Sequence, residues 1–203
     1  PKHGLARYIG SPTFRPLIAC VALQGTSTAA VEFIEDPEAA AHQLAALIGN
    51  NTIVAHNAGF EKAVLDRIGL HYSYDRFIDS AVVARAAGAA GRLEAAAPQL
   101  LNTDKLEAGK NLMRLFSIPP KDAEPDREFD PQVIEDNHDD WLEYIHYCKV
   151  DAELGLRIAS EYLHVLAPME LKYQAVTMAM NETGWRVDLD TVTEMQRRYE
   201  ENL

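Results

Sequence analysis

The sequence predicts a mixed α/β fold, with strands in the first part of the chain and mostly helices in the second. Two apolar segments, 17–23 and 30–34, favour neighbouring strands, because Gly25 lies between them at a turn. Beyond residue 92, apolar residues recur at the spacing of helices that pack on one face. Polar residues lie where a later apolar strand meets a helix, so we expect a functional site that joins the two parts.

The first half of the chain is expected to alternate strands with helices. Asp36 and Pro37 indicate a helix start, since Asp favours the cap and Pro the first helical position. Gly69 indicates where a later helix ends. After the two opening strands, the expected elements are a helix at 37–48, a strand at 52–56, a helix at 59–68, a short strand at 76–78 and an Ala-rich helical segment that Asp79 or Ser80 caps.

The second half is expected to be helical, with one long loop. Residues 118–132 carry four prolines and many charges, which predicts an exposed excursion. A short strand is expected at 185–189, just after Gly184. The expected helices are 92–101, 109–116, 139–165 as one long helix or two abutting ones, 169–182, and a last one from about 190 to the end.

Composition limits the classes of function. No apolar stretch approaches the length of a membrane span, so we predict a soluble protein with no membrane partner. The net charge of −12 argues against a broad basic face that grips duplex nucleic acid, yet a nuclease that holds a few nucleotides needs little positive charge. Cys20 and Cys148 are the only cysteines, which suits a reducing cytoplasm. The chain begins at Pro1, so we expect a fragment of a longer polypeptide.

Two segments about ninety positions apart carry the candidate chemistry. Glu61 opens a helix directly after a buried strand, at the strand end where open α/β sheets hold their sites. Asp151 follows Tyr147 by one helical turn. Two carboxylates and a phenol are parts of a metal-dependent phosphodiesterase site, and hard oxygen ligands suit Mg²⁺ or Mn²⁺. We therefore expect Glu61 and Asp151 to face a common cleft within about 10 Å, with Tyr147 on its rim.

Helical register selects the partner of Asp151. At about 100° per residue, Tyr147 lies about 40° from Asp151 around the helix and His146 about 140° away. In a functional site the Tyr147 hydroxyl orients the attacking water. A half-buried tyrosine that only packs is an equally ordinary alternative. Taken alone, Glu61 is explained as a solvated acid in a first helical turn, where the helix dipole favours a negative charge. Asp151, taken alone, is also explained without a functional role.

His56, Asn57 and Phe60 lie at the corner before Glu61 and are the candidate substrate-binding residues. Each also has a simpler explanation. A histidine at a strand end more often has its hydrogen bonds satisfied inside the fold than it acts as a ligand. Asn57, taken singly, favours capping of the helix that follows, and Phe60 favours core packing.

The two segments resemble motifs of a known family. Ala55-His-Asn-Ala-Gly-Phe-Glu61 is similar to the second, and Tyr147-Cys-Lys-Val-Asp151 to the third, exonuclease motif of the tyrosine-type 3′–5′ exonucleases with four acidic site residues. The nearest likeness is to the proofreading domain of family A DNA polymerases, especially those of bacteriophages. The segment 180–188 resembles the part that leads into the polymerase domain. The likeness covers almost the whole chain.

The resemblance implies a role for each site residue. Asp151 would coordinate the tightly held metal, and Glu61 would hold the second metal through water. Glu61 departs from the Asp that is usual there. Tyr147 would orient the nucleophilic water, while Asn57 and Phe60 would line the site near the terminal nucleotide.

The resemblance also implies a ribonuclease H-like mixed sheet flanked by helices, with a helical C-terminal extension. The first motif of the family, Asp-X-Glu on the opening strand, is missing, because the sequence begins after the place where it should lie. The chain therefore carries half of the metal ligands, and we expect the sheet to lack a central strand. We expect two parts, an exonuclease domain at 1–168 and the start of a polymerase-domain segment at 169–203.

The leading hypothesis is the proofreading exonuclease of a DNA polymerase, which acts on a single-stranded or frayed 3′ end of DNA. Under this hypothesis a polymerase domain belongs to the same polypeptide. The two-metal site is expected to be incomplete in this chain. One alternative is a free-standing ribonuclease of the same fold, which the polymerase-like tail disfavours. The other is a module that binds DNA ends or proteins without cutting, which the absence of the first motif favours.

Overall fold

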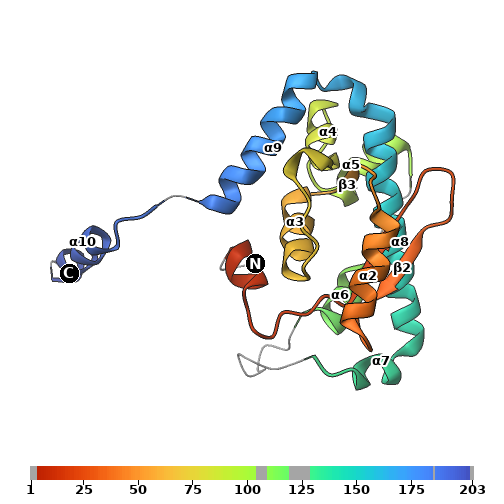
Figure 1. Cartoon of the computed structure of the whole chain (residues 1–203), viewed down its shortest axis with the longest axis horizontal. Helices are drawn as coiled ribbons and strands as arrows, with labels where there is room; N and C mark the ends of the chain where they lie inside the picture. Colours follow the sequence, from red (N-terminus) through yellow and green to blue (C-terminus); the bar gives the residue numbers. More distant parts are fainter. Residues whose placement is uncertain (1–3, 104–108, 119–128, 185, 202–203) are drawn as a thin grey trace.

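The computed structural model describes residues 4–103, 109–118, 129–184 and 186–201 (Figure 1). Helices surround a few short strands, which confirms the mixed α/β class. The last helix projects from the body on an extended connection (Figure 1). No helix among the described residues is long and apolar enough to cross a membrane.

The strands form two separate pairs. β1 (Ile18–Val21) runs antiparallel to β2 (Ala29–Glu32), and β3 (Ile53–Ala55) runs parallel to β4 (Phe77–Asp79). Within the described residues, each of the four strands has a partner on one side only. The single mixed sheet that the resemblance implies is therefore divided in two here, and a ribonuclease H-like arrangement stays a prediction.

Two helices of the first half, α2 and α4, begin at the capping residues that the sequence indicates. The Asp36 carboxylate accepts a hydrogen bond from the Ala39 amide at 2.9 Å and starts α2 (Pro37–Ile48), as the sequence predicts. α3 (Ala58–Arg67) follows β3, and α4 (Ser80–Ala86) follows β4. A short helix that the sequence analysis missed, α1 (Leu5–Ile9), precedes β1.

The second half is helical, as expected, and α8 runs through its centre. α8 (His138–Tyr162) is one unbroken helix, and it packs against both β1 and β3 as well as α4, α5 and α6. Ile158 on α8 is completely buried. The remaining elements are α5 (Leu93–Leu101), α6 (Gly109–Phe116), α7 (Gln132–Asp136), a 3₁₀ turn at Leu163–Val165, α9 (Pro168–Thr183) and α10 (Leu189–Glu201), with another 3₁₀ turn at Tyr74–Arg76 before β4.

One expectation about the second half was wrong, and another was met at its described residues. The predicted loop 118–132 is non-helical at residues 118 and 129–131, and only its last residue, Gln132, belongs to α7; residues 119–128 lie outside the described part. Of the predicted strand 185–189, the described residues 186–188 form no strand. Asp188 instead accepts hydrogen bonds from the backbone amide and the hydroxyl of Thr191 and so caps α10.

α9 covers the outer edge of β4. The Gln174 side chain is buried, donates to the Phe77 carbonyl at 3.0 Å and accepts from the Asp79 amide at 3.1 Å. Its amide group thus pairs with the strand edge as a neighbouring strand would, which protects the edge from other partners. α9 belongs to the segment 169–203 that we assigned to a second domain, yet it packs on the first.

Candidate functional site

A cavity of 760 Å³ lies between the two strand pairs. Every residue of 18–23 and of 51–57 lines it. Because successive side chains of a strand point to opposite faces, a cavity that touches every residue lies at the edge of the strand and not on one face. The free edges of β1 and β3 therefore border the cavity. Residues of α3 and α8 also line it, together with residues of α2, α4 and α5. A strand within packed layers occupies about 3.3 by 4.8 by 10 Å per residue, so this volume equals about five strand residues. The cavity therefore has room for about one short strand.

Glu61 and Asp151 line this same cavity, as the predicted common cleft requires. Glu61 comes from the first turn of α3 and Asp151 from the middle of α8. The Glu61 Oε2 atom is buried without a hydrogen-bond partner among the described residues. A buried carboxylate oxygen without a partner is costly, so a strand or a cation in the cavity would satisfy it.

The two carboxyl groups bind protons more tightly than usual. Burial raises the pKa of Glu61 to about 8, and the negative charge of Asp79 adds to the effect. Burial also raises the pKa of Asp151 to about 6, while its interaction with the Tyr147 hydroxyl opposes that rise. At neutral pH Glu61 is therefore mostly protonated and Asp151 mostly ionised. A divalent cation would displace the remaining protons, because only the ionised groups bind metal well.

Tyr147 shares a face of α8 with Asp151, as the register predicts. Its hydroxyl lies close enough to the Asp151 carboxylate for the two groups to interact, and this interaction adds to the rise in the pKa of Tyr147. The aromatic ring lies against Gly109 at the start of α6: a Cβ atom on Gly109 would fall 2.3 Å from the ring carbon that bears the hydroxyl. Gly109 therefore leaves the room in which Tyr147 reaches Asp151.

The three candidate substrate-binding residues have different surroundings. Asn57 is exposed, has a left-handed backbone (φ 75°) and makes no capping hydrogen bond. Phe60 lines the cavity and stacks on Tyr8 with ring centroids 6.3 Å apart. His56 also lines the cavity, but its Nδ1 lies 3.0 Å from Ser80 Oγ and its Nε2 lies 3.1 Å from the Gly91 carbonyl. These two bonds match the simpler explanation for His56, and its role in substrate binding stays a prediction.

The sequence analysis missed Asp79 as a site residue. Its buried carboxylate accepts hydrogen bonds from the backbone amides of Asn57 at 2.9 Å and Ala58 at 3.2 Å, and from Ala81 at 2.8 Å. It therefore holds the corner that precedes Glu61 and fixes the starts of α3 and α4 together. The sequence signal was its position at a predicted strand end, which we interpreted as a helix cap only.

Among the described residues, no group of three or more His, Cys, Asp or Glu side chains gathers to hold a metal ion. Glu61 and Asp151 are two oxygen donors on one cavity, and the partnerless Glu61 oxygen fits a site that lacks part of its ligands. The donor types suit Mg²⁺ or Mn²⁺. Metal binding itself stays a prediction.

We expect a Glu61→Gln variant to lose most of the pH dependence of stability between pH 5 and pH 8. The folded-state pKa of about 8 lies above the ordinary value of 4.5, so the stabilisation is complete below 4.5 and disappears as the pH rises through 8. For wild type, the free energy of unfolding should fall by on the order of 3 kcal/mol over this range because of this group. Denaturant titrations at each pH measure it.

A matched control for this prediction is Glu38→Gln, which changes an exposed acid in the first turn of α2. The control should keep the pH dependence of the wild type. Parallel stability curves for wild type and Glu61→Gln would show that Glu61 is not the group that titrates.

We expect Gly109→Ala to impair the site as much as the loss of the Tyr147 hydroxyl does. The new methyl group collides with the Tyr147 ring, so the ring must move and the interaction with Asp151 is lost. Burial and the Asp151 carboxylate raise the pKa of Tyr147 well above its usual range. A change in this pKa, followed by absorbance titration, reports the movement of the ring without any assay of activity. Gly59→Ala is the control, since nothing lies within 4 Å of the Cβ position there.

Comparison with known proteins gives one similarity of note. A DNA polymerase of Bacillus phage SP02 is 26% identical over 196 residues, which cover 94% of this chain and 30% of the polymerase. No family model and no solved structure matches the chain. The chain thus resembles a region of a phage DNA polymerase and spans about 30% of that protein's length.

Proposed function

We propose that the chain is the 3′–5′ exonuclease portion of a DNA polymerase, which removes 3′-terminal nucleotides from DNA by two-metal hydrolysis. The observation that carries the proposal is that Glu61 and Asp151, from segments ninety positions apart, line one cavity, with Tyr147 beside Asp151. The similarity to a phage DNA polymerase supports a role in DNA metabolism.

Each residue has a chemical task under this proposal. Asp151 would hold one divalent ion, and Glu61 would help to hold the second. When bound, the two ions supply a nucleophilic hydroxide and neutralise the leaving oxygen. Tyr147 would orient the attacking water, since its hydroxyl lies beside Asp151. Asp79 positions Glu61 by holding the corner before α3.

The proposed site is incomplete in this chain. Two carboxylates supply too little charge and too few oxygens to hold two divalent ions tightly. The cavity between β1 and β3 has room for about five strand residues. A strand there with the Asp-X-Glu motif would supply the other ligands and join the strand pairs into one sheet. We therefore propose that catalysis requires this strand.

The aromatic side chains next to the site suit a single-stranded DNA end. Phe60 lines both the 760 Å³ cavity and a neighbouring one of 520 Å³. Tyr8 and Phe14 border the second cavity, and Tyr8 contacts both other rings. Bases stack on such rings without regard to sequence, which is what a proofreading nuclease requires. Binding of a frayed 3′ end along Phe60 is part of the proposal.

The alternatives predict different products. A ribonuclease would prefer RNA of the same sequence, and a binding module would retain DNA without shortening it. The placement of Tyr147 beside Asp151 disfavours the binding module, which does not need it, but does not distinguish the two nucleases.

The test is a ladder assay with a polypeptide extended upstream of Pro1 by the strand. A 5′-labelled single-stranded DNA should shorten one nucleotide at a time in Mg²⁺ or Mn²⁺, and the same DNA labelled at the 3′ end should release its label first. Faster loss of an RNA of equal sequence would favour a ribonuclease. Retention of intact DNA, measured by polarisation, would favour the binding module.

A further inference from the structure

α9 is apolar on two opposite faces, and only one of them is covered. Its inner face packs on the body through Leu171, Gln174 and Met178. The opposite face carries four large apolar residues at spacings of four, three and four, which align on one side of a helix. These residues form the outer stripe of α9: Met169, Tyr173, Val176 and Met180, with exposed fractions of 51, 63, 56 and 56%.

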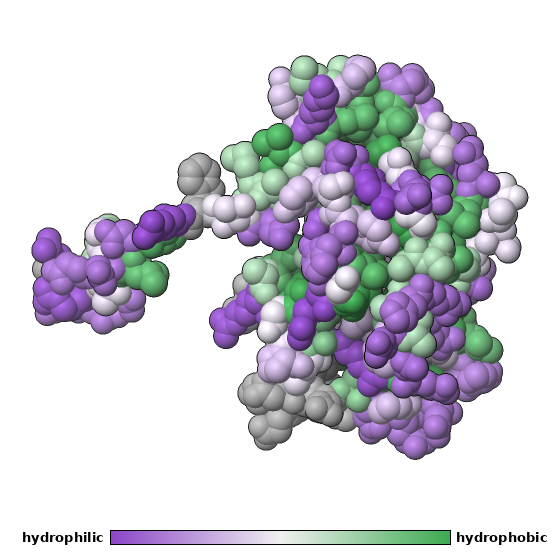
Figure 2. Space-filling view, in the orientation of Figure 1, coloured by the Kyte–Doolittle hydropathy of each residue, from purple (hydrophilic) through white to green (hydrophobic). Residues whose placement is uncertain are grey.

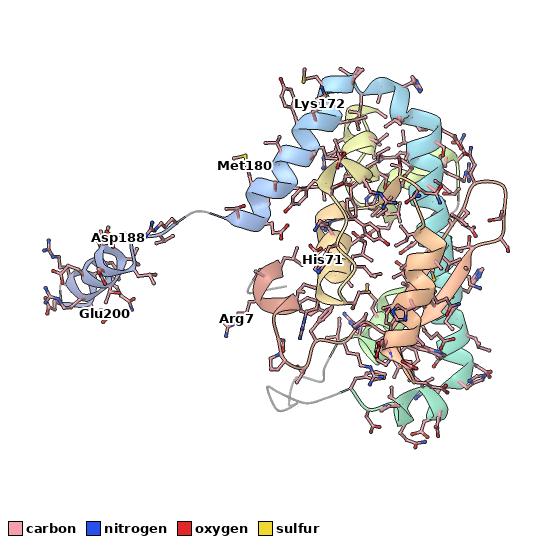
Figure 3. The ribbon with its side chains drawn as sticks, in the orientation of Figure 1. Arg7, His71, Lys172, Met180, Asp188 and Glu200 are labelled. Carbon is pink, nitrogen blue, oxygen red and sulfur yellow. The ribbon has the colours of Figure 1, made fainter. Side chains whose placement is uncertain are left out.

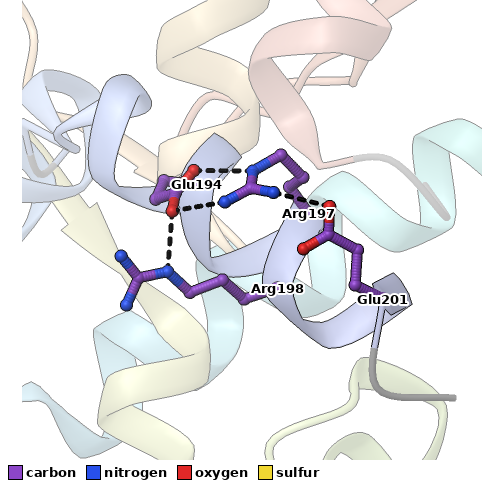
Figure 4. Close-up of polar contacts among 4 residues, drawn as sticks. All are labelled: Glu194, Arg197, Arg198 and Glu201. Atoms are coloured by element: carbon purple, nitrogen blue, oxygen red, sulfur yellow. Dashed lines mark hydrogen bonds and ion pairs between the residues drawn. The ribbon is translucent and has the colours of Figure 1, made fainter.

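α10 has a matching stripe and a fully polar opposite face. On the polar face Glu194 pairs with Arg197 at 2.9 Å and with Arg198 at 2.7 Å, and Arg197 also pairs with Glu201 (Figure 4). No residue of α10 is buried. Apolar side chains remain visible on the projecting tail (Figure 2). The stripe of α10 consists of Leu189, Val192, Met195 and Tyr199, with exposed fractions of 73, 47, 66 and 68%.

The charge of α10 points to a protein surface rather than a lipid one. α10 has four acids and two arginines, so its net charge is −2. Helices that lie on membranes carry an excess of Lys and Arg on the polar face. A helix of 13 residues is also marginal when it stands alone in water, so a partner surface is needed to stabilise it.

We propose that α10 folds back on α9 and that the two stripes form an antiparallel helical hairpin. At a rise of 1.5 Å per residue, the stripe of α9 is about 16 Å long and that of α10 about 15 Å. The connection has five residues, 184–188, and helical hairpins use connections of about two to five. Five residues span up to about 17 Å, more than the 8–10 Å between packed helix axes.

The start and end of the connection suit a reversal of the chain. Gly184 ends α9 with a positive φ of 66°, a conformation that favours glycine. Met180 lies in the last turn of α9 before the connection and points away from the body, and Asp188 is the last residue of the connection (Figure 3). In the hairpin the facing pairs are Met180 with Leu189, Val176 with Val192, Tyr173 with Met195 and Met169 with Tyr199.

The hairpin is independent of the exonuclease proposal and can be tested with the chain as it is. In a Cys20→Ala, Cys148→Ala background, the pair Val176→Cys, Val192→Cys should form an intramolecular disulfide in a glutathione redox buffer. Its rate should exceed that of the control pair Val176→Cys, Thr193→Cys by about tenfold or more, because Thr193 lies about 100° away around α10. The rate should not depend on protein concentration. Circular dichroism verifies that both variants fold.

Small-angle scattering provides a second measurement without cysteines. Val192→Asp should open the hairpin and increase the radius of gyration, whereas Thr193→Asp on the polar side should leave it unchanged. Equal disulfide rates for the two pairs, or equal radii for the two Asp variants, would overturn the proposal. Cross-linked dimers whose yield rises with concentration would also overturn it, because the stripes would then bind a second copy.

Discussion

Asp151→Ala should reduce the release of 3′-terminal nucleotides by several orders of magnitude in a polypeptide that includes the upstream strand. Asp151 is the proposed direct ligand of a divalent ion, and without it the hydroxide nucleophile is no longer generated or positioned. Tyr147→Phe should cost less, since it removes one orienting hydrogen bond and no ligand. Single-turnover rates on a 3′-labelled oligonucleotide in Mg²⁺ or Mn²⁺ measure both effects.

Asp139→Ala is the matched control, because Asp139 is an exposed acid in the first turn of the same helix. It should retain the rate of the wild type. Single-turnover rates for Asp151→Ala equal to those of the wild type would show that we have assigned the site to the wrong residues. A loss in both variants would point instead to a general effect of charge on α8.

Local signals in the sequence predicted most of the elements. α2 was predictable because Asp36 and Pro37 act within one turn of it, and the Ala39 bond confirms the cap. The strand expected at 185–189 failed because a strand needs a partner, and Asp188 satisfies the amides of α10 instead. How strands pair depends on contacts between distant parts of the chain, so the division into two pairs was visible only in the structure.

The site was predictable where its geometry is set by one helix. The register of α8 places Tyr147 beside Asp151, and the influence of each side chain on the pKa of the other agrees with that placement. The role of Asp79 was not predictable, because its partners are backbone amides 21 and 22 residues earlier in the chain. The high pKa of Glu61 likewise follows from burial by other elements and not from its neighbours in sequence.

Addition of a strand upstream of Pro1 should restore both the sheet and the activity. The chain without the extension should show weak or single-metal binding and no appreciable cleavage, since it has two of the four expected acids. A strand of about five residues would fill the cavity between β1 and β3, pair with both free edges and raise the melting temperature by about 5 °C or more. With Asp-X-Glu in that strand, metal-dependent release of 3′ nucleotides should appear.

An extension with Asn-X-Gln in place of Asp-X-Glu separates the two effects. It has the same shape and keeps the backbone hydrogen bonds, so it should raise the melting temperature equally. It lacks the charge that divalent ions require, so cleavage should stay at the level of the chain without the extension. Calorimetry and the release of a 3′ label measure the two outcomes. Robust cleavage by the unextended chain, or by the Asn-X-Gln form, would mean that other residues complete the site and that the cavity is not the place of the missing ligands.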